Sequence, residues 1–225
     1  GVTGVQTCAL RSVLAFWCIR EPLKIGIGAG FVPGTLDMGV VDEVVAVTGS
    51  NGSGKSTLLR GLAGFQPMEC SSFTISGQPA APDSDLHRDV TYAVMDEWMW
   101  LRGMTVRDHF EVFHEESSLC DPEQALTEFG VLNLADRMPH SLSSGQLRRV
   151  TLASLLVRPW RILFIDEPEQ RLDEEYQGIL AGILERYLGD RAAIIATHAA
   201  PLLGSVVTQV LHLDGSPSPH TRKVH

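Results

Sequence analysis

Short apolar runs that end in turn residues recur along this chain, and they predict the strands of a buried sheet. Residues 43–47 (Glu-Val-Val-Ala-Val) lead into a Thr-Gly turn, and similar runs occupy 161–165 and 192–196. Because these runs are almost wholly apolar, they are typical of strands covered on both faces, as in a parallel sheet.

Weaker patterns between these runs predict two more strands and a helix. Strands are expected at 73–75 and 90–94, on either side of a loop at 77–85 that is rich in Gly, Pro and Asp. After Lys55, leucines at helical spacing predict a helix that packs one face on the sheet and ends at Gly64.

A longer helical region is expected from Thr105 to about Val157. Thr105 and Asp108 have the spacing of a capping box, and Phe110 and Phe113 share one side of the segment that follows. Strands that alternate with helices, with a helical block between two groups of strands, predict an α/β core that carries an inserted helical subdomain.

Charge and composition narrow the classes of partner. The chain has 225 residues, of which 44% are hydrophobic, so it can form one compact domain, or one domain with an inserted subdomain. With 18 basic and 27 acidic residues, the net charge is -9. We therefore expect no nucleic acid partner, since a chain with this acidic balance is not expected to present a basic surface that could neutralise a run of phosphates.

The apolar runs and the cysteines indicate a protein of the cytoplasm. The longest apolar run, residues 13–19, is far shorter than the roughly 20 residues that span a bilayer. The four cysteines lie far apart and form no CxxC pair, which fits neither a disulfide scaffold nor a zinc site. Residues 1–12 lack periodicity and the features of a secretory signal, and are expected to be a disordered or artefactual tail.

A glycine-rich segment between the first predicted strand and helix matches GxxxxGK[ST] and indicates a phosphate site. Its sequence is Gly49-Ser50-Asn51-Gly52-Ser53-Gly54-Lys55-Ser56-Thr57. Glycines let backbone N–H groups turn inward, where they form an anion cradle with the helix N-terminus. We expect Lys55 to reach the β- and γ-phosphates and Ser56 to ligate Mg²⁺. The alternative, a glycine-rich turn with an exposed lysine, does not explain the flanking strand and helix.

Two carboxylates follow the strongest predicted strand. Asp166 directly follows Ile165 and can serve the phosphate-bound Mg²⁺, while Glu167 can orient the water that attacks the γ-phosphate. Taken alone, Asp-Glu-Pro is more simply explained as a solvated strand end before a turn. The phosphate loop upstream favours the catalytic interpretation.

A further motif carries a family resemblance. Leu142-Ser143-Ser144-Gly145-Gln146 resembles the LSGGQ signature of ATP-binding cassette (ABC) ATPases, with Ser144 in place of a signature glycine. Across about 40–214, the order of phosphate loop, signature, ILFIDEP and Thr197-His198 is similar to a single nucleotide-binding domain of that family.

The resemblance implies an α/β fold: a P-loop NTPase core with a mainly parallel sheet, an antiparallel β region and an inserted helical subdomain. The first part of the core, with the phosphate loop, is expected at 13–97, and the helical subdomain with the signature at 98–157. The second part of the core is expected at 158–214, and a polar C-terminal tail at 215–225.

The resemblance also implies roles for residues outside the phosphate loop. Signature residues would contact, in trans, the γ-phosphate held by a second ABC ATPase domain in a homo- or heterodimer; they are Ser143, Ser144, Gly145 and Gln146. Asp173 would lie in the D-loop, which connects the two sites, and His198 would be the switch histidine that contacts the γ-phosphate.

One position departs from the family. The glutamine expected after the strand at 90–94 is replaced by Met95-Asp96-Glu97. Asp96 could substitute as a water-mediated Mg²⁺ contact, although its side chain is shorter and charged.

The sequence therefore predicts an ATP- and Mg²⁺-dependent ATPase subunit of an ABC transporter. It would dimerise around two Mg-ATP and drive a separate transmembrane permease subunit, on the inner face of the cell membrane. Two alternatives remain: a soluble ABC ATPase with a regulatory or assembly role, and a degenerate cassette with slow turnover. Glu167 and His198 argue against the second.

Overall fold

The computed structural model describes residues 26–29, 44–66, 70–75, 78–79, 81, 84–95, 100–189, 191–198, 204, 206–213 and 220–223. The tail predicted at 1–12, the segment 30–43 and the proposed metal contact Asp96 lie outside these residues.

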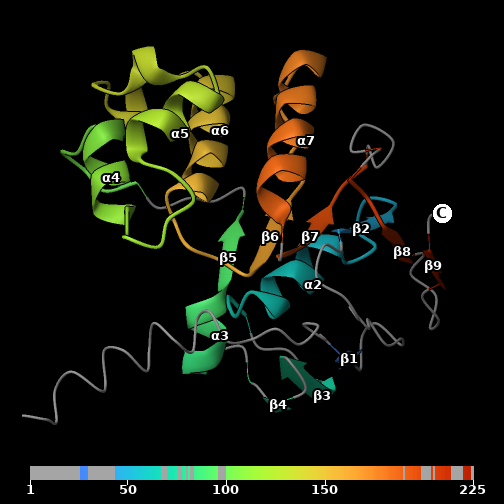
Figure 1. The fold of residues 1–225 in the computed structure, drawn as a ribbon. Helices are drawn as coiled ribbons and strands as arrows, with labels where there is room; N and C mark the ends of the chain where they lie inside the picture. Colours follow the sequence, from blue (N-terminus) through green and yellow to red (C-terminus); the bar gives the residue numbers. More distant parts are fainter. Residues whose placement is uncertain are drawn as a thin grey trace, which may run out of the picture.

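A six-stranded sheet forms the centre of the molecule (Figure 1). Its strands are β2 (Val44–Gly49), β5 (Thr91–Val94), β6 (Ile162–Asp166), β7 (Ala192–Ala196), β8 (Gln209–Leu213) and β9 (His220–Lys223). Their order is β5-β6-β7-β2-β8-β9, and all pairs are parallel except β8 with β9.

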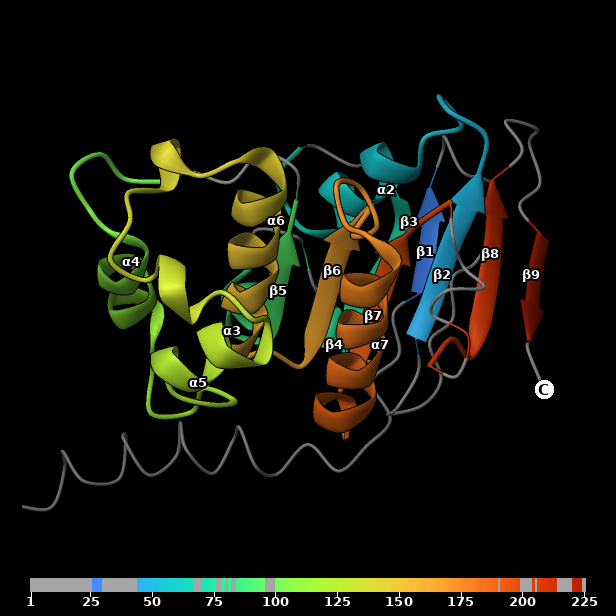
Figure 2. The same cartoon turned by 90° about the horizontal axis from the view of Figure 1, so that it is seen from above.

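The register of this sheet brings three strand ends together. β7 lies between β6 and β2, and Ala196 at its end is opposite both Val47 of β2 and Asp166 of β6. Because all three strands are parallel, the segments that follow them leave the sheet at the same edge, which can be followed in Figure 2. In an open α/β sheet, this carboxyl edge is where ligands bind.

Both faces of the sheet are buried at its central strands β2, β6 and β7, as the apolar runs predict. Val44 and Ala46 belong to one apolar cluster and Val45 and Val47 to another. This alternation places successive side chains of β2 on opposite faces. Helix α7 (Glu174–Leu188) contributes to the first cluster and helix α2 (Lys55–Leu62) to the second.

The strand predicted at 192–196 is confirmed as β7, and the run at 161–165 is confirmed as β6, shifted by one residue. The run at 43–47 is confirmed as β2, which starts one residue later and ends two residues later. Strand β8 was not predicted, since its burial alternates between inward and outward residues and its sequence includes Gln209 and His212. Residues 220–223 form β9, within the segment expected to be a polar tail.

A second, three-stranded antiparallel sheet has the order β1-β3-β4. Its strands are β1 (Gly26–Ala29), β3 (Cys70–Ile75) and β4 (Gln78–Pro79). The prediction of a loop throughout 77–85 was wrong at both ends, because β4 lies there and helix α3 (Asp85–Val90) begins there. Ser84 caps this short helix by accepting a hydrogen bond from the backbone N–H of His87.

Helices and 3₁₀ turns occupy the segment from 106 to 156, at the upper left of Figure 1. They are α4 (Val106–Phe113), α5 (Pro122–Glu128), η1 (Leu132–Leu134), η2 (Pro139–Ser141), α6 (Ser144–Ala153) and η3 (Ser154–Leu156). The predicted capping box is confirmed: Thr105 Oγ1 accepts from Asp108 N at 3.1 Å, and Thr105 N donates to Asp108 Oδ2 at 2.7 Å.

None of the helices in the described part of the chain has both the length and the apolar character that a bilayer span requires.

Candidate functional site

The phosphate loop lies between β2 and α2, and glycines set its backbone. Gly49, the last residue of β2, has φ 150°, and a Cβ there would lie 2.2 Å from the carbonyl oxygen of Leu213. Gly54, just before α2, has φ 97°. Both positions need glycine because a larger residue would clash at the first and be strained at the second.

The N-terminus of α2 has features of an anion site. Gly54, at the N-cap, supplies no side-chain hydrogen bond, and the first turn of the helix contains no acidic residue. The first N–H groups of a helix have no partner within the helix and carry partial positive charge. A bound phosphate can satisfy them at the place where a capping side chain would stand.

Lys55 is the cation of this loop. It is only 4% exposed, and its ammonium donates to the carbonyl oxygens of Gly49 at 3.0 Å and Ser50 at 3.2 Å. These two bonds hold the charge inside the loop and leave a third ammonium proton to donate.

Ser56 and Asp166 are brought together from segments 110 residues apart. The Ser56 hydroxyl in α2 donates to Asp166 Oδ1, at the end of β6, at 3.0 Å. Burial raises the pKa of Asp166, the Ser56 hydrogen bond lowers it in part, and the nearby Glu167 raises it further. A hydroxyl oxygen and a buried carboxylate oxygen therefore lie side by side.

Glu167 and His198 form the second polar pair. His198 Nε2 lies 3.1 Å from Glu167 Oε1, and the side chains are 41% and 19% exposed. Glu167 has φ 42°, a left-handed conformation that is uncommon outside glycine. Strained backbone of this kind is frequent at functional sites, where the surrounding structure holds it.

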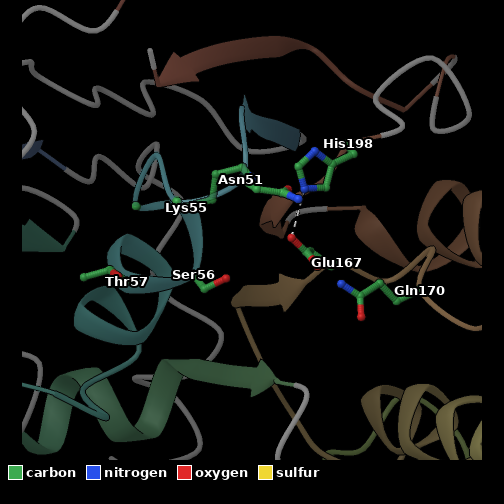
Figure 3. A pocket seen from close by; sticks show the side chains of 9 residues that line it. Asn51, Lys55, Ser56, Thr57, Glu167, Gln170 and His198 are labelled. Atoms are coloured by element: carbon green, nitrogen blue, oxygen red, sulfur yellow. Dashed lines mark hydrogen bonds and ion pairs between the residues drawn. The ribbon is translucent and has the colours of Figure 1, made fainter. Parts of the chain in front are cut away.

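These groups surround an open pocket of about 460 Å³ (Figure 3). The pocket is lined by Asn51, Gly52, Gly54, Lys55, Ser56, Thr57, Glu167, Gln170 and His198. Of the residues predicted for nucleotide binding, Gly49, Ser50 and Ser53 belong to the loop but do not line the pocket. Asp166 contacts the pocket through Ser56. The pocket thus has a cationic loop on one side and a carboxylate with an imidazole on the other.

The signature residues lie at the start of α6 and do not line this pocket. Ser143 Oγ accepts from Gln146 N at 3.3 Å, and Gln146 Oε1 accepts from Ser143 N at 3.0 Å, so the two side chains cap the helix reciprocally. Ser144 is exposed, and a Cβ on Gly145 would lie 3.2 Å from the carbonyl oxygen of Arg171. Asp173 caps α7 by accepting from Tyr176 N at 3.1 Å.

Three polar residues of this region were missed by sequence reasoning. Gln170 lines the pocket, and Glu169 accepts hydrogen bonds from the residues that follow β7. Arg148 in α6 is 4% exposed and donates to the carbonyl oxygens of Asp166 at 2.6 Å and Glu167 at 2.8 Å. Glu169 and Gln170 directly follow the Asp-Glu-Pro motif, which could have drawn attention to them, whereas nothing in the sequence indicates the partners of Arg148.

The sequence model of the ABC transporter family matches residues 39–170. The cytochrome c biogenesis ATP-binding export protein of Paracoccus denitrificans is 35% identical over 171 residues, which are 75% of this chain and 75% of that protein. The corresponding protein of Paramagnetospirillum magneticum is 31% identical over 204 residues, 88% of this chain and 90% of that protein. The Fe(3+) ions import ATP-binding protein of Pseudomonas fluorescens is 33% identical over 162 residues, which are 68% of this chain and 46% of that protein.

Solved structures share the fold at lower identity. A dimeric ATP-binding cassette in a post-hydrolysis state, with ADP and Pi bound, superposes with a TM-score of 0.73 at 19% identity, over 90% of this chain and 98% of that one. A bacterial Atm1-family ABC exporter with ATP bound gives a TM-score of 0.77 at 20% identity, over 91% of this chain and 39% of that one.

Proposed function

Because this chain belongs to the ABC transporter family, we propose that it is the ATP-hydrolysing domain of an ABC transporter, closing as a dimer around two Mg-ATP to drive a transmembrane partner. The observation that carries the proposal is the convergence of Lys55, Ser56, Glu167 and His198 on one pocket. Relatives named as import proteins and as export proteins both match this chain.

Binding of ATP is assigned to the phosphate loop. The uncapped N-terminus of α2 and the Lys55 ammonium would hold the β- and γ-phosphates, and Asn51 and Thr57 also line the pocket. When the γ-phosphate is bound, the Lys55 protons now shared by the carbonyls of Gly49 and Ser50 can turn to phosphate oxygens.

Ser56 and Asp166 fit Mg²⁺. Both offer oxygen, the donor that this cation prefers, and they lie within hydrogen-bond distance of each other. In the described part of the chain, no cluster of three His, Cys, Asp or Glu could hold a metal alone. This fits a cation that keeps several waters and takes its remaining ligands from phosphate. Mg²⁺, when bound, would neutralise charge on the phosphates.

Glu167 and His198 are assigned to the chemical step. Glu167 Oε1 would accept a proton from the attacking water or orient it, and His198, which lies beside Glu167 in the pocket, would contact the γ-phosphate. The 3.1 Å contact between them fixes the direction of both side chains before substrate is bound.

The arrangement of the signature supports a role in trans. Ser143, Ser144 and Gly145 stand at a helix N-terminus, which favours an anion, yet they do not line the pocket of their own chain. A second copy or a related domain placed head to tail would bring them to the γ-phosphate, and Asp173 would lie at that interface. A transmembrane subunit would then hold the dimer at the inner face of the membrane.

The test compares the Mg-dependent ATPase rate of the wild type and Glu167→Gln over a range of protein concentrations. We expect the wild-type rate to rise faster than linearly with protein, and Glu167→Gln to bind ATP, lose hydrolysis and accumulate as a dimer. Glu174→Gln is the matched control because Glu174 is exposed, in the first turn of α7. Lys55→Ala should lose nucleotide affinity.

A Glu167→Gln variant that keeps most of its activity would remove Glu167 from the chemical step. A strictly linear dependence on concentration, with no dimer in the presence of ATP, would contradict the dimeric site.

A further inference from the structure

Glu169 is a third carboxylate at the carboxyl edge of the sheet, and the chemistry described above does not use it. It lies in the turn between β6 and α7, two residues after Glu167. Its Oε1 accepts two hydrogen bonds, from the Thr197 hydroxyl at 2.8 Å and from the backbone N–H of His198 at 2.6 Å. One carboxylate oxygen therefore holds both residues that follow β7.

These hydrogen bonds lie at the point where the pairing of β7 with the neighbouring strand ends. Thr197 N still donates to the carbonyl oxygen of Val47, at 3.0 Å, as a continuation of the pairing of β7 with β2. One residue later this pairing has ended. Within the described residues, the hydrogen bonds of His198 go only to Glu169 and Glu167, the first through the backbone and the second through the ring.

The second oxygen of Glu169 has a different environment. Glu169 Oε2 is buried and has no hydrogen-bond partner in the described part of the chain. Since only one carboxylate oxygen makes hydrogen bonds, the role of Glu169 depends on a side chain long enough to bring one acceptor oxygen to Thr197 and His198. An amide of the same length could make the same two contacts, whereas a shorter carboxylate could not.

We propose that Glu169 is a positioning residue for hydrolysis: by holding Thr197 and the backbone of His198, it places the His198 ring against Glu167 in the nucleotide pocket. This inference rests on the proposed ATPase function. The substrate of the proposed ATPase is ATP, and Glu169 acts on the γ-phosphate only through His198.

Three variants separate reach from charge. Glu169→Ala removes the acceptor, Glu169→Asp keeps the charge but shortens the side chain by one methylene, and Glu169→Gln keeps the length without the charge. We expect kcat for ATP hydrolysis to fall about tenfold or more in the Ala and Asp variants, since two hydrogen bonds that place His198 are lost. We expect it to stay within about threefold of wild type in the Gln variant.

Nucleotide affinity should not follow kcat. The phosphate loop lies between β2 and α2, and the hydrogen bonds of Glu169 to described residues go to Thr197 and His198 instead. The dissociation constant of ATP should therefore stay within about twofold of wild type in all three variants. Glu175→Gln is the matched control because Glu175 is an exposed glutamate on the next helix. A Gln variant as inactive as Ala, beside an active Asp variant, would show that the charge acts directly and would overturn the proposal.

A double-mutant cycle tests whether Glu169 acts through His198. If it does, Glu169→Ala in a His198→Ala background should cause no further loss of kcat, because the group that it positions is gone. If the two substitutions lower kcat multiplicatively in the double variant, Glu169 acts independently of His198 and the positioning role is refuted.

An NMR measurement makes the test independent of activity. The ring signals of His198, assigned with His198→Ala, should shift in Glu169→Ala and keep their wild-type positions in Glu169→Gln at the same pH. Unchanged signals in Glu169→Ala would overturn the proposal even in a protein that hydrolyses ATP. If the signals shift in Glu169→Ala but the wild type shows no ATPase activity, the placement of His198 by Glu169 is still supported. That result would contradict only the proposed function.

Discussion

Replacement of Arg148 by methionine should lower the free energy of unfolding by about 2 to 4 kcal/mol. The Arg148 guanidinium in α6 donates to the carbonyl oxygens of Asp166 and Glu167, at 2.6 and 2.8 Å, and the side chain is 4% exposed. Methionine fills a similar volume but offers no donor, so the carbonyl oxygens would lose this charged partner.

The magnitude follows from these two contacts. A hydrogen bond to a charged group contributes about 1.5 to 3 kcal/mol, which gives about 3 to 6 kcal/mol for the pair. Methionine also avoids the desolvation of a buried guanidinium, which offsets part of that loss. The third contact, to the carbonyl oxygen of Met95 at 3.5 Å, is too long to add to the total.

Urea unfolding followed by circular dichroism measures the effect, with Arg149→Met as the matched control. Arg149 is the next residue on the same helix, and its guanidinium lies 4.1 Å from the centre of the Tyr176 ring. A cation–π contact of this kind contributes about 0.5 to 1 kcal/mol at a partly exposed site. If Arg148→Met loses no more stability than Arg149→Met, the two carbonyl contacts do not stabilise the fold and the reasoning fails.

Three other substitutions probe the phosphate loop, the signature helix and the buried carboxylate. Gly49→Ala should abolish ATP binding in an equilibrium fluorescence titration, because its Cβ would lie 2.2 Å from the carbonyl oxygen of Leu213; an affinity near wild type would contradict this packing. Ser143→Ala should lower the free energy of unfolding by about 1 kcal/mol through loss of the N-cap, whereas Ser144→Ala, at an exposed position, should leave it nearly unchanged. The raised pKa of Asp166 means that the folded state retains its proton to higher pH, so stability should fall as pH rises above the ordinary aspartate range. Asp166→Asn should flatten that dependence in denaturation curves, and an equal slope in both proteins would refute the assignment.

Local patterns were sufficient to predict the centre of the sheet and the phosphate loop. The strands β6 and β7 are buried along their length and apolar except for Asp166 at the end of β6, and the glycines of the loop stand at fixed spacing from Lys55. Burial on both faces and backbone conformation are properties of a few consecutive residues, so sequence alone can indicate them.

Contacts between distant segments could not be predicted in the same way. The hydrogen bonds of Glu169 reach residues 28 and 29 positions away, and Arg148 reaches 18 and 19 positions to Asp166 and Glu167. Each depends on the register of strands and on the direction of one side chain in space. Composition and periodicity give no information about either.

The position of β7 has a consequence for the synthesis of the protein. This strand lies between β6 and β2, although it follows both in the chain, so the sheet is complete only after it has entered between them. A chain growing on the ribosome would contain the phosphate loop long before residue 192 is made, yet Glu167 would still lack His198. Contacts between such distant segments form late in folding because loop closure must precede them. The ability to hydrolyse ATP would therefore arise only with the completed sheet.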